Sequence, residues 1–276
     1  MAVREIRVCS LGELIDGLTP SEPDPSTGRR RDTGVYRGEP DAREPLLTSL
    51  DALGTREGGA PHAKADLEEH ILRNFARYSR PYLDAPPASE WELLASAQHH
   101  GVPTRLLDWS YSPLVAAHFA TRHLRGGDAA RDCAVWRLDW QAVHRCFDLP
   151  PLALLVDDLE TLFDAEPGHE RRDGRFTPWA CFAGRHPRDF ACMIEPSTID
   201  ARIAAQRGTF TLCSDRTRPF DVFLEAHGLG GALTKYVLPA DVTGRVRDQL
   251  DLVGMDERGL FPDLDGVAAE LRRYYS

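Results

Sequence analysis

The sequence predicts an α+β fold in which a mixed, mostly antiparallel sheet is flanked by helices. Two patterns predict it: short segments that alternate apolar and polar residues, typical of half-buried strands, and amphipathic segments of helical period between them. The 276 residues have an ordinary hydrophobic content of 42% and show no internal repeat, so they are enough for one sizeable core. We therefore expect a single domain over residues 1–276, with polar loop insertions at 19–33 and 165–188.

The N-terminal part of the chain is expected to alternate strands with helices. In order, we expect a strand at 3–8, a helix at 11–18, a strand at 34–38, a helical start near 46–50, a Gly- and Pro-rich loop at 54–62 and an amphipathic helix at 63–78. Ser89 is placed to cap a helix that begins near Glu90, and Gly101 followed by Pro103 marks the end of that helix.

The central and C-terminal parts continue the same alternation. We expect a short strand or extended turn at 104–107, followed by a helix to about residue 124 for which Ser112 and Pro113 form a good N-cap and first turn. Further along we expect strands at 133–138, 190–194, 209–213 and 233–238, and helices at 152–163, 197–206, 241–252 and 267–274.

Composition excludes several classes of function. The net charge of −10 argues against general nucleic-acid binding, which usually needs a basic surface. There is no apolar run of roughly 18 residues for a membrane span and no signal-peptide core, so we expect a cytoplasmic protein without a membrane partner. The six cysteines are scattered without a Cys-x-x-Cys pair, which favours reduced thiols, and no ligand spacing indicates a metal site.

The stretch from residue 98 to 119 concentrates polar and aromatic side chains between two helical patterns. Ser112 lies at a helix start, where unpaired N–H groups attract a phosphate or carboxylate, although it is also a simple cap. Arg105 and Asp108 either pair as structural ions, or Asp108 orients a ligand-binding group such as His99, His100 or Arg37. His100 is a candidate general base, and the alternative is a helix-end interaction.

Other candidate residues likewise have a ligand-binding interpretation and a structural one. Trp109 either stacks on a planar ring or packs in the core, and Ser110 would line a pocket beside it. Arg37 lies between Tyr36 and Gly38 on a strand, which suits bidentate binding of a pyrophosphate, and a buried ion pair is the alternative. Gln206 precedes a glycine and a strand, so it either reaches into a cleft or ends a helix.

These residues resemble the FRG domain family, named for a Phe/Tyr-Arg-Gly tripeptide. The resemblance is carried by four blocks: Tyr36-Arg37-Gly38, the stretch from Trp91 to Phe119 with Gln98-His-His-Gly-x-Pro-Thr-Arg-Leu-Leu-Asp-Trp109, the stretch from Arg202 to Phe210 with Gln206-x-Gly-x-Phe210, and Leu260-Phe-Pro-Asp-Leu-Asp-Gly266. It covers most of the chain and implies one FRG-type domain.

The order of these blocks is also similar, more weakly, to that of the ADP-ribosyltransferases, which implies a fold of that type. By this resemblance Arg37 holds the pyrophosphate of NAD and the middle block builds the nicotinamide pocket. A carboxylate of the third block usually stabilises the oxocarbenium-like ribose. Here Gln206 stands in that block without a charge, which moves the carboxylate to Asp108 or Glu195.

We therefore expect an NAD-dependent ADP-ribosyltransferase or NAD glycohydrolase-like enzyme, acting as a bacterial toxin or as a stress or defence effector, with NAD as substrate and no metal. Asp108 or Gln206 would orient the ribose or the nucleophile, His99 or His100 would assist, and Ser110 and Ser112 would line the pocket. The alternative is a non-catalytic module that binds a nucleotide or a protein in the same cleft. A third interpretation makes the central block purely structural.

Overall fold

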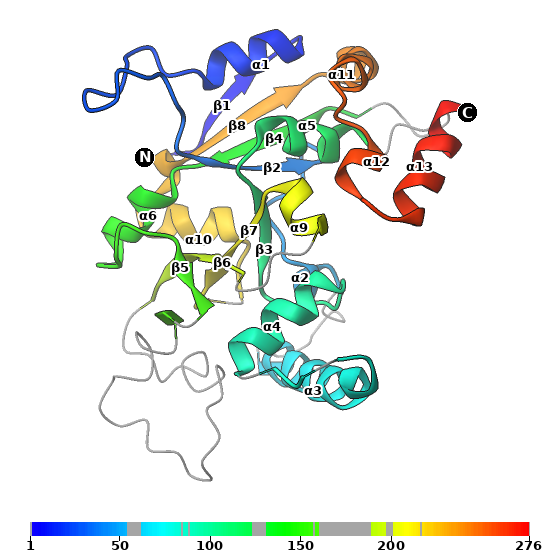
Figure 1. Cartoon of the computed structure of the whole chain (residues 1–276). Coiled ribbons are helices and arrows are strands. Elements are labelled where there is room, and N and C mark those ends of the chain that lie inside the picture. The colour runs from blue at the N-terminus through cyan, green and yellow to red at the C-terminus, as the bar shows by residue number, and fades with distance from the viewer. Residues whose placement is uncertain are drawn as a thin grey trace.

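The computed structural model describes residues 2–53, 62–83, 85–87, 89–122, 131–156, 158–159, 189–196, 201–215 and 217–275, without the side chains of 62–66 (Figure 1). In this part of the chain the strands form one eight-stranded sheet in the order β1-β8-β4-β2-β3-β7-β6-β5. The outer pairs β1–β8 and β5–β6 are parallel and the pairs between them are antiparallel. The predicted α+β fold with a mixed, mostly antiparallel sheet is therefore confirmed.

The strands are short, as expected from the alternating segments. They are β1 (Arg4–Arg7), β2 (Val35–Glu39), β3 (Leu107–Ser110), β4 (Cys133–Leu138), β5 (Leu154–Leu155), β6 (Ala191–Glu195), β7 (Gly208–Cys213) and β8 (Leu233–Leu238).

Helices follow or precede most of these strands. They are α1 (Leu11–Leu18), α2 (Ser49–Ala52), α3 (His62–Ser79), α4 (Glu90–His99), α5 (Pro113–Thr121), α6 (Trp140–Cys146), α9 (Ala201–Gln206), α10 (Phe220–Ala226), α11 (Ala240–Leu252), α12 (Glu257–Leu260) and α13 (Leu264–Tyr274), with 3-10 turns η1 (Arg80–Tyr82) and η3 (Gly230–Ala232).

Several predicted boundaries need correction. Of the strand or extended turn expected at 104–107, residues 104–106 form an irregular segment fixed by side-chain contacts, and the strand lies at Leu107–Ser110, where it pairs with β7. The helix expected at 152–163 begins instead with β5, which pairs with β6, and residues 160–163 lie outside the described residues. Helices α6, α10 and α12 were not predicted.

The structure describes the first of the two expected insertions but not the second. Residues 19–33 contain turns and irregular chain without a helix or strand, as expected of a polar loop. Residues 165–188 lie outside the described residues, as do 54–61 of the expected Gly- and Pro-rich loop. The single-domain organisation over the whole chain stays a prediction.

Three apolar clusters hold the layers together. On one face of the sheet, α6 and α10 pack over the middle strands, with Trp109, Trp136 and Phe223 in this cluster. On the other face, α1, α5 and α11 cover the half of the sheet formed by β1, β8, β4 and β2. The third cluster joins α3 and α4 to β5, β6 and β7, as Figure 1 shows.

The junction of the two halves of the sheet lies between β2 and β3. Both strands lie wholly within the described residues, and their registered pairing is limited to Tyr36 opposite Ser110. On the face that carries α5 and α4, these helices cover different halves of the sheet. A cavity opens between them above this junction.

Candidate functional site

The cavity between α4 and α5 has a volume of about 390 Å³, within the range usual for small-molecule sites. Its floor is formed by β2, β3 and β7, and α4, α5 and α9 supply its walls. Three arginines and two carboxylates line it, namely Arg37, Arg122, Arg202, Glu39 and Asp108. The cavity therefore has a locally cationic lining in a chain whose net charge is −10.

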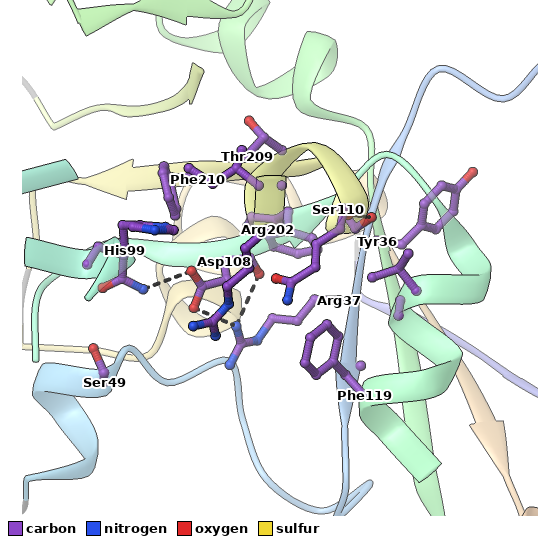
Figure 2. Close-up of a pocket in the computed structure, with 18 of the residues that line it drawn as sticks. Tyr36, Arg37, Ser49, His99, Asp108, Ser110, Phe119, Arg202, Thr209 and Phe210 are labelled. Atoms are coloured by element: carbon purple, nitrogen blue, oxygen red, sulfur yellow. Dashed lines mark hydrogen bonds and ion pairs between the residues drawn. The ribbon is translucent and has the colours of Figure 1, made fainter. Parts of the chain in front are cut away.

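Asp108 projects from β3 into the cavity, and its orientation is fixed. Gln98 of α4 donates an Nε2–H bond of 2.9 Å to Asp108 Oδ1, and the Oε1 atom of Gln98 accepts a 2.5 Å bond from the Thr104 hydroxyl. Figure 2 shows Asp108 between His99 and Arg37, with Phe119 farther along the cavity. The Asp108 side chain remains 61% exposed, so the carboxylate is held and still accessible to a ligand.

Arg37 enters the same space from β2, and its guanidinium is already engaged. Its Nε donates to Glu39 Oε1 at 2.5 Å and its Nη1 donates to the backbone carbonyl of Asp108 at 3.1 Å. The Asp108 carboxylate lies 3.9 Å from Nη1. Arg37 thus bridges the two strands at the place where their backbone pairing is limited.

Tyr36 and Gly38 lie on the α5 side of β2 and shape the cavity wall. The Tyr36 hydroxyl donates a 2.5 Å bond to Asp32 and points away from Asp108 (Figure 2). Burial and this carboxylate raise the pKa of Tyr36 far above its usual range. A Cβ atom at Gly38 would lie 1.9 Å from the Ala116 carbonyl oxygen, so glycine is what allows β2 and α5 to approach this closely.

Ser110 and Gln206 join β3, α5 and α9 at the end of the cavity. Ser110 Oγ donates a 2.7 Å bond to the Gln206 carbonyl and accepts one of 3.0 Å from the Ser112 amide. Gln206 Nε2 donates to the Leu260 carbonyl at 3.0 Å, which attaches the C-terminal segment to the site. Both residues line the cavity, and their polar groups are largely engaged in hydrogen bonds within the protein.

Four candidate residues have functional groups that are buried or lie outside the cavity. Trp109 contributes to the cavity lining, but its indole is 3% exposed, lies among the residues under α10 and donates to Thr211 at 2.9 Å. Arg105 is buried against Glu68, away from the cavity lining. Ser112 occupies the N-cap position of α5 without the side-chain cap bond that we expected, and His100 ends α4 beside Phe75.

Glu195, the other candidate carboxylate, accepts a 2.5 Å bond from the Tyr111 hydroxyl. It is outside the cavity lining formed by the described residues, so Asp108 is the better placed of the two. His99 lines the cavity from the end of α4. His118 is buried between α5 and α11, and Arg247 donates a 2.7 Å bond to its Nδ1.

The structure adds residues that the sequence patterns did not single out as site candidates. Arg122, Arg202, Glu39, Phe119 and Phe210 all line the cavity. Arg122 ends α5 and Arg202 begins α9, eighty positions apart in the sequence numbering, so only the tertiary fold brings them together. The FRG-like blocks contained Arg202 and Phe119 without distinguishing them from their neighbours.

Two features of the described residues bear on the expected partners. These residues contain no group of three His, Cys, Asp or Glu side chains arranged to hold a metal ion. None of the helices described is both long enough and apolar enough to cross a membrane.

Comparison with known proteins gives a family match for part of the chain. The chain matches no curated protein and no solved structure. Residues 32–128 match the family model of the FRG domain, a segment that includes β2, α4, β3 and α5 and most of the cavity lining. The predicted FRG resemblance is confirmed over this segment, whereas the similarity to ADP-ribosyltransferases stays a prediction. Residues 32–128 are thus similar to the FRG domain, and the rest of the chain lies outside this match.

Proposed function

We propose that this protein cleaves the N-glycosidic bond of NAD in the cavity between α4 and α5, as an NAD glycohydrolase or an ADP-ribosyltransferase. The observation that carries the proposal is the Asp108 carboxylate, which Gln98 orients and which stays 61% exposed. When the bond to nicotinamide breaks, positive charge develops on the ribose. A carboxylate fixed in advance at that position stabilises the oxocarbenium-like transition state.

The reaction needs only NAD and an acceptor. The bond between ribose C1′ and the pyridinium nitrogen breaks, and its electron pair leaves with nicotinamide, which becomes neutral. The oxygen of water, or a nucleophilic atom of another acceptor, forms the new bond at C1′ and releases one proton. Asp108 would stabilise the positive charge, and His99, at the edge of the cavity, is placed nearer than His100 to receive that proton.

The remaining lining supports a nucleotide ligand. The partly exposed Phe119 offers an aromatic face for a planar ring, which the buried Trp109 indole does not. The described cysteines are free thiols, as expected for a reducing compartment, and we propose a cytoplasmic location where NAD is present. Consumption of NAD there would suit a toxin or a stress or defence effector.

The test is nicotinamide release from NAD, followed chromatographically with water as the acceptor. Asp108→Asn keeps the size of the side chain and removes its charge, and we expect the rate to fall by at least about a hundredfold. Asp265→Asn, at an exposed position in the first turn of α13, is the matched control and should leave the rate unchanged. Equal rates for wild type and Asp108→Asn would refute the proposed role.

A non-catalytic nucleotide-binding module is the second candidate. It is favoured by the position of Arg37, which approaches both cavity carboxylates and offsets their charge. This alternative predicts that NAD or ADP-ribose raises the melting temperature while no nicotinamide is released. Turnover that depends on Asp108 would exclude it.

A further inference from the structure

The cavity contains a pair of arginines that the proposed chemistry at Asp108 does not use. We infer that Arg122 and Arg202 form a phosphate-binding subsite, which holds the diphosphate of a nucleotide ligand. The identity of that nucleotide as NAD rests on the proposed function, whereas the subsite itself rests on the arrangement of these two residues. Arg122 and Arg202 would then make the pyrophosphate contact that the resemblance to ADP-ribosyltransferases assigns to Arg37.

The two guanidinium groups come from different elements and meet around one ring. The central carbon of Arg202 lies 5.1 Å from the centre of the Phe261 ring, and that of Arg122 lies 6.0 Å from the same centre. Arg122 also lies 5.4 Å from the centre of the Phe119 ring, which packs edge-on against Phe261 at 6.1 Å. Stacking on aromatic faces orients a guanidinium and leaves its N–H groups available at the edge.

Neither arginine has its charge balanced by a partner in the described part of the chain. Within it, no carboxylate lies within ion-pair distance of Arg122 or Arg202. The nearby Glu257 carboxylate is bound by Arg247 at 3.1 Å and by Arg273 at 2.8 Å. Burial and the positive charge of Arg202 lower the pKa of Arg122, and the charge of Glu257 opposes this shift. Like charges repel, so an anion between the two guanidinium groups would be stabilising.

Arg37 is less suited to the same task. Its Nε is occupied by Glu39 and its Nη1 by the Asp108 carbonyl, so the face it turns toward β3 is committed to the protein. A phosphate there would also meet the Glu39 and Asp108 carboxylates, which repel it. Among the described residues, no carboxylate lies within ion-pair distance of the Arg122 or Arg202 guanidinium group. A diphosphate has the negative charge and enough oxygen atoms to accept hydrogen bonds from both groups.

Phe261 follows α12, whose last residue, Leu260, accepts the hydrogen bond from Gln206. The C-terminal segment therefore fixes the ring against which both guanidiniums lie. Phe261 is thus a positioning residue for the subsite, outside the FRG domain match at 32–128. This gives the segment a role in binding even though it is not among the residues that line the cavity.

The test is calorimetric binding of inorganic pyrophosphate, ADP and adenosine to the full chain. We expect ADP to bind more tightly than adenosine, and Arg122→Gln or Arg202→Gln to weaken ADP at least about tenfold while adenosine is unaffected. Arg145→Gln, at an exposed position on α6, is the control and should bind as wild type does. Because Arg122 and Arg202 are both exposed, we expect both variants to fold, and each tests the subsite independently.

The outcomes separate this inference from the proposed function. ADP binding that depends on both arginines, without release of nicotinamide from NAD, would support the subsite and refute the enzyme. Release of nicotinamide with unchanged ADP affinity in Arg202→Gln would support the enzyme and overturn the subsite. Equal wild-type affinities for ADP and adenosine would also overturn it.

Discussion

Glu68 binds Arg105 through three hydrogen bonds, one to the backbone amide at 2.9 Å and two to the guanidinium at 2.8 and 2.5 Å. Both side chains are almost fully buried, with exposures of 0% and 2%. The pair attaches α3 to the extended segment that leads into β3. The arginine that stood among the candidate ligand residues therefore serves to position the strand that carries Asp108.

Breaking this pair is expected to destabilise the protein strongly. Glu68→Gln removes the charge of the carboxylate that accepts both guanidinium hydrogen bonds in a buried site, which should lower the free energy of unfolding by about 3–5 kcal/mol. Urea denaturation measures the change. Arg43→Met is the control, since it removes an ion pair to Asp41 whose arginine is 78% exposed, and it should cost far less than Glu68→Gln. Similar losses in the two variants would show that burial does not set the strength of the Glu68 pair.

Gly38→Ala is expected to destabilise the sheet beside the cavity. The added Cβ would meet the Ala116 carbonyl at 1.9 Å and the Ala120 amide nitrogen at 2.5 Å, and backbone atoms cannot turn aside. We expect a loss of about 1–3 kcal/mol in the free energy of unfolding. Gly244→Ala in α11 is the control, because a Cβ atom added there meets no neighbouring segment of the described chain within 4 Å, and alanine should stabilise the helix by roughly 0.4–1 kcal/mol. A neutral Gly38→Ala would mean that α5 can move away.

His118 is expected to make stability depend on pH. Arg247 can only donate, so the Nδ1 atom it contacts accepts and the imidazole is neutral. Burial, the Arg247 charge and that of Arg122 together lower its pKa from 6.5 to about 4, against an opposing effect of Glu257. The unfolded chain therefore binds the proton more tightly, and stability is lost as the pH falls from 6.5 through 4.

The expected size of this effect is about 3 kcal/mol. His118→Gln keeps an acceptor for Arg247 and cannot titrate. The unfolding free energies of wild type and variant, compared at pH 7 and pH 4.5, isolate the contribution of His118 from that of the carboxylates. If the difference between the two proteins is the same at both pH values, the imidazole is not the group responsible.

Gln98 is expected to affect turnover through Asp108. Gln98→Met retains a side chain of similar length and removes the 2.9 Å bond that orients the carboxylate. If Asp108 stabilises the reacting ribose, a less ordered carboxylate should slow nicotinamide release by about ten- to hundredfold. The KM for NAD should change little, because Gln98 lies at the Asp108 end and not at the arginine pair. Gln141→Met on α6 serves as the control, and a rise in KM alone would argue for a binding role instead.

Much of the fold follows from local patterns. The helix at 11–18 has the predicted bounds, and Ser89 caps α4 through the Glu92 amide, as its position before an amphipathic run predicts. Gly101 has a φ of 75°, which explains why glycine ends that helix. These features depend on residues within one or two turns of each other, so the sequence contains all the information needed.

The site was harder to predict, because its contacts join distant segments. Alternation along β3 places Trp109 on one face and Asp108 on the other, but only the position of α10 shows which face is the core. Arg105 looked available because its partner Glu68 lies 37 residues earlier. Arg122 and Arg202 acquire meaning only when α5 and α9 meet around Phe261. The residue types in the sequence indicated which kinds of side chain the site would contain. Only the tertiary structure shows which of these side chains lie together in the cavity.

The junction at Tyr36 and Ser110 has a mechanical consequence. On the cavity face the two halves of the sheet have separate apolar clusters, while the cluster under α6 and α10 spans both from the opposite face. The sheet therefore has a weakly paired junction with a continuous apolar cluster behind it, and we expect bending there to change the width of the cavity without separating either of the two clusters on the cavity face. A molecule that contacts both walls would restrain that bending. Binding of such a molecule should slow amide hydrogen exchange on both β2 and β3.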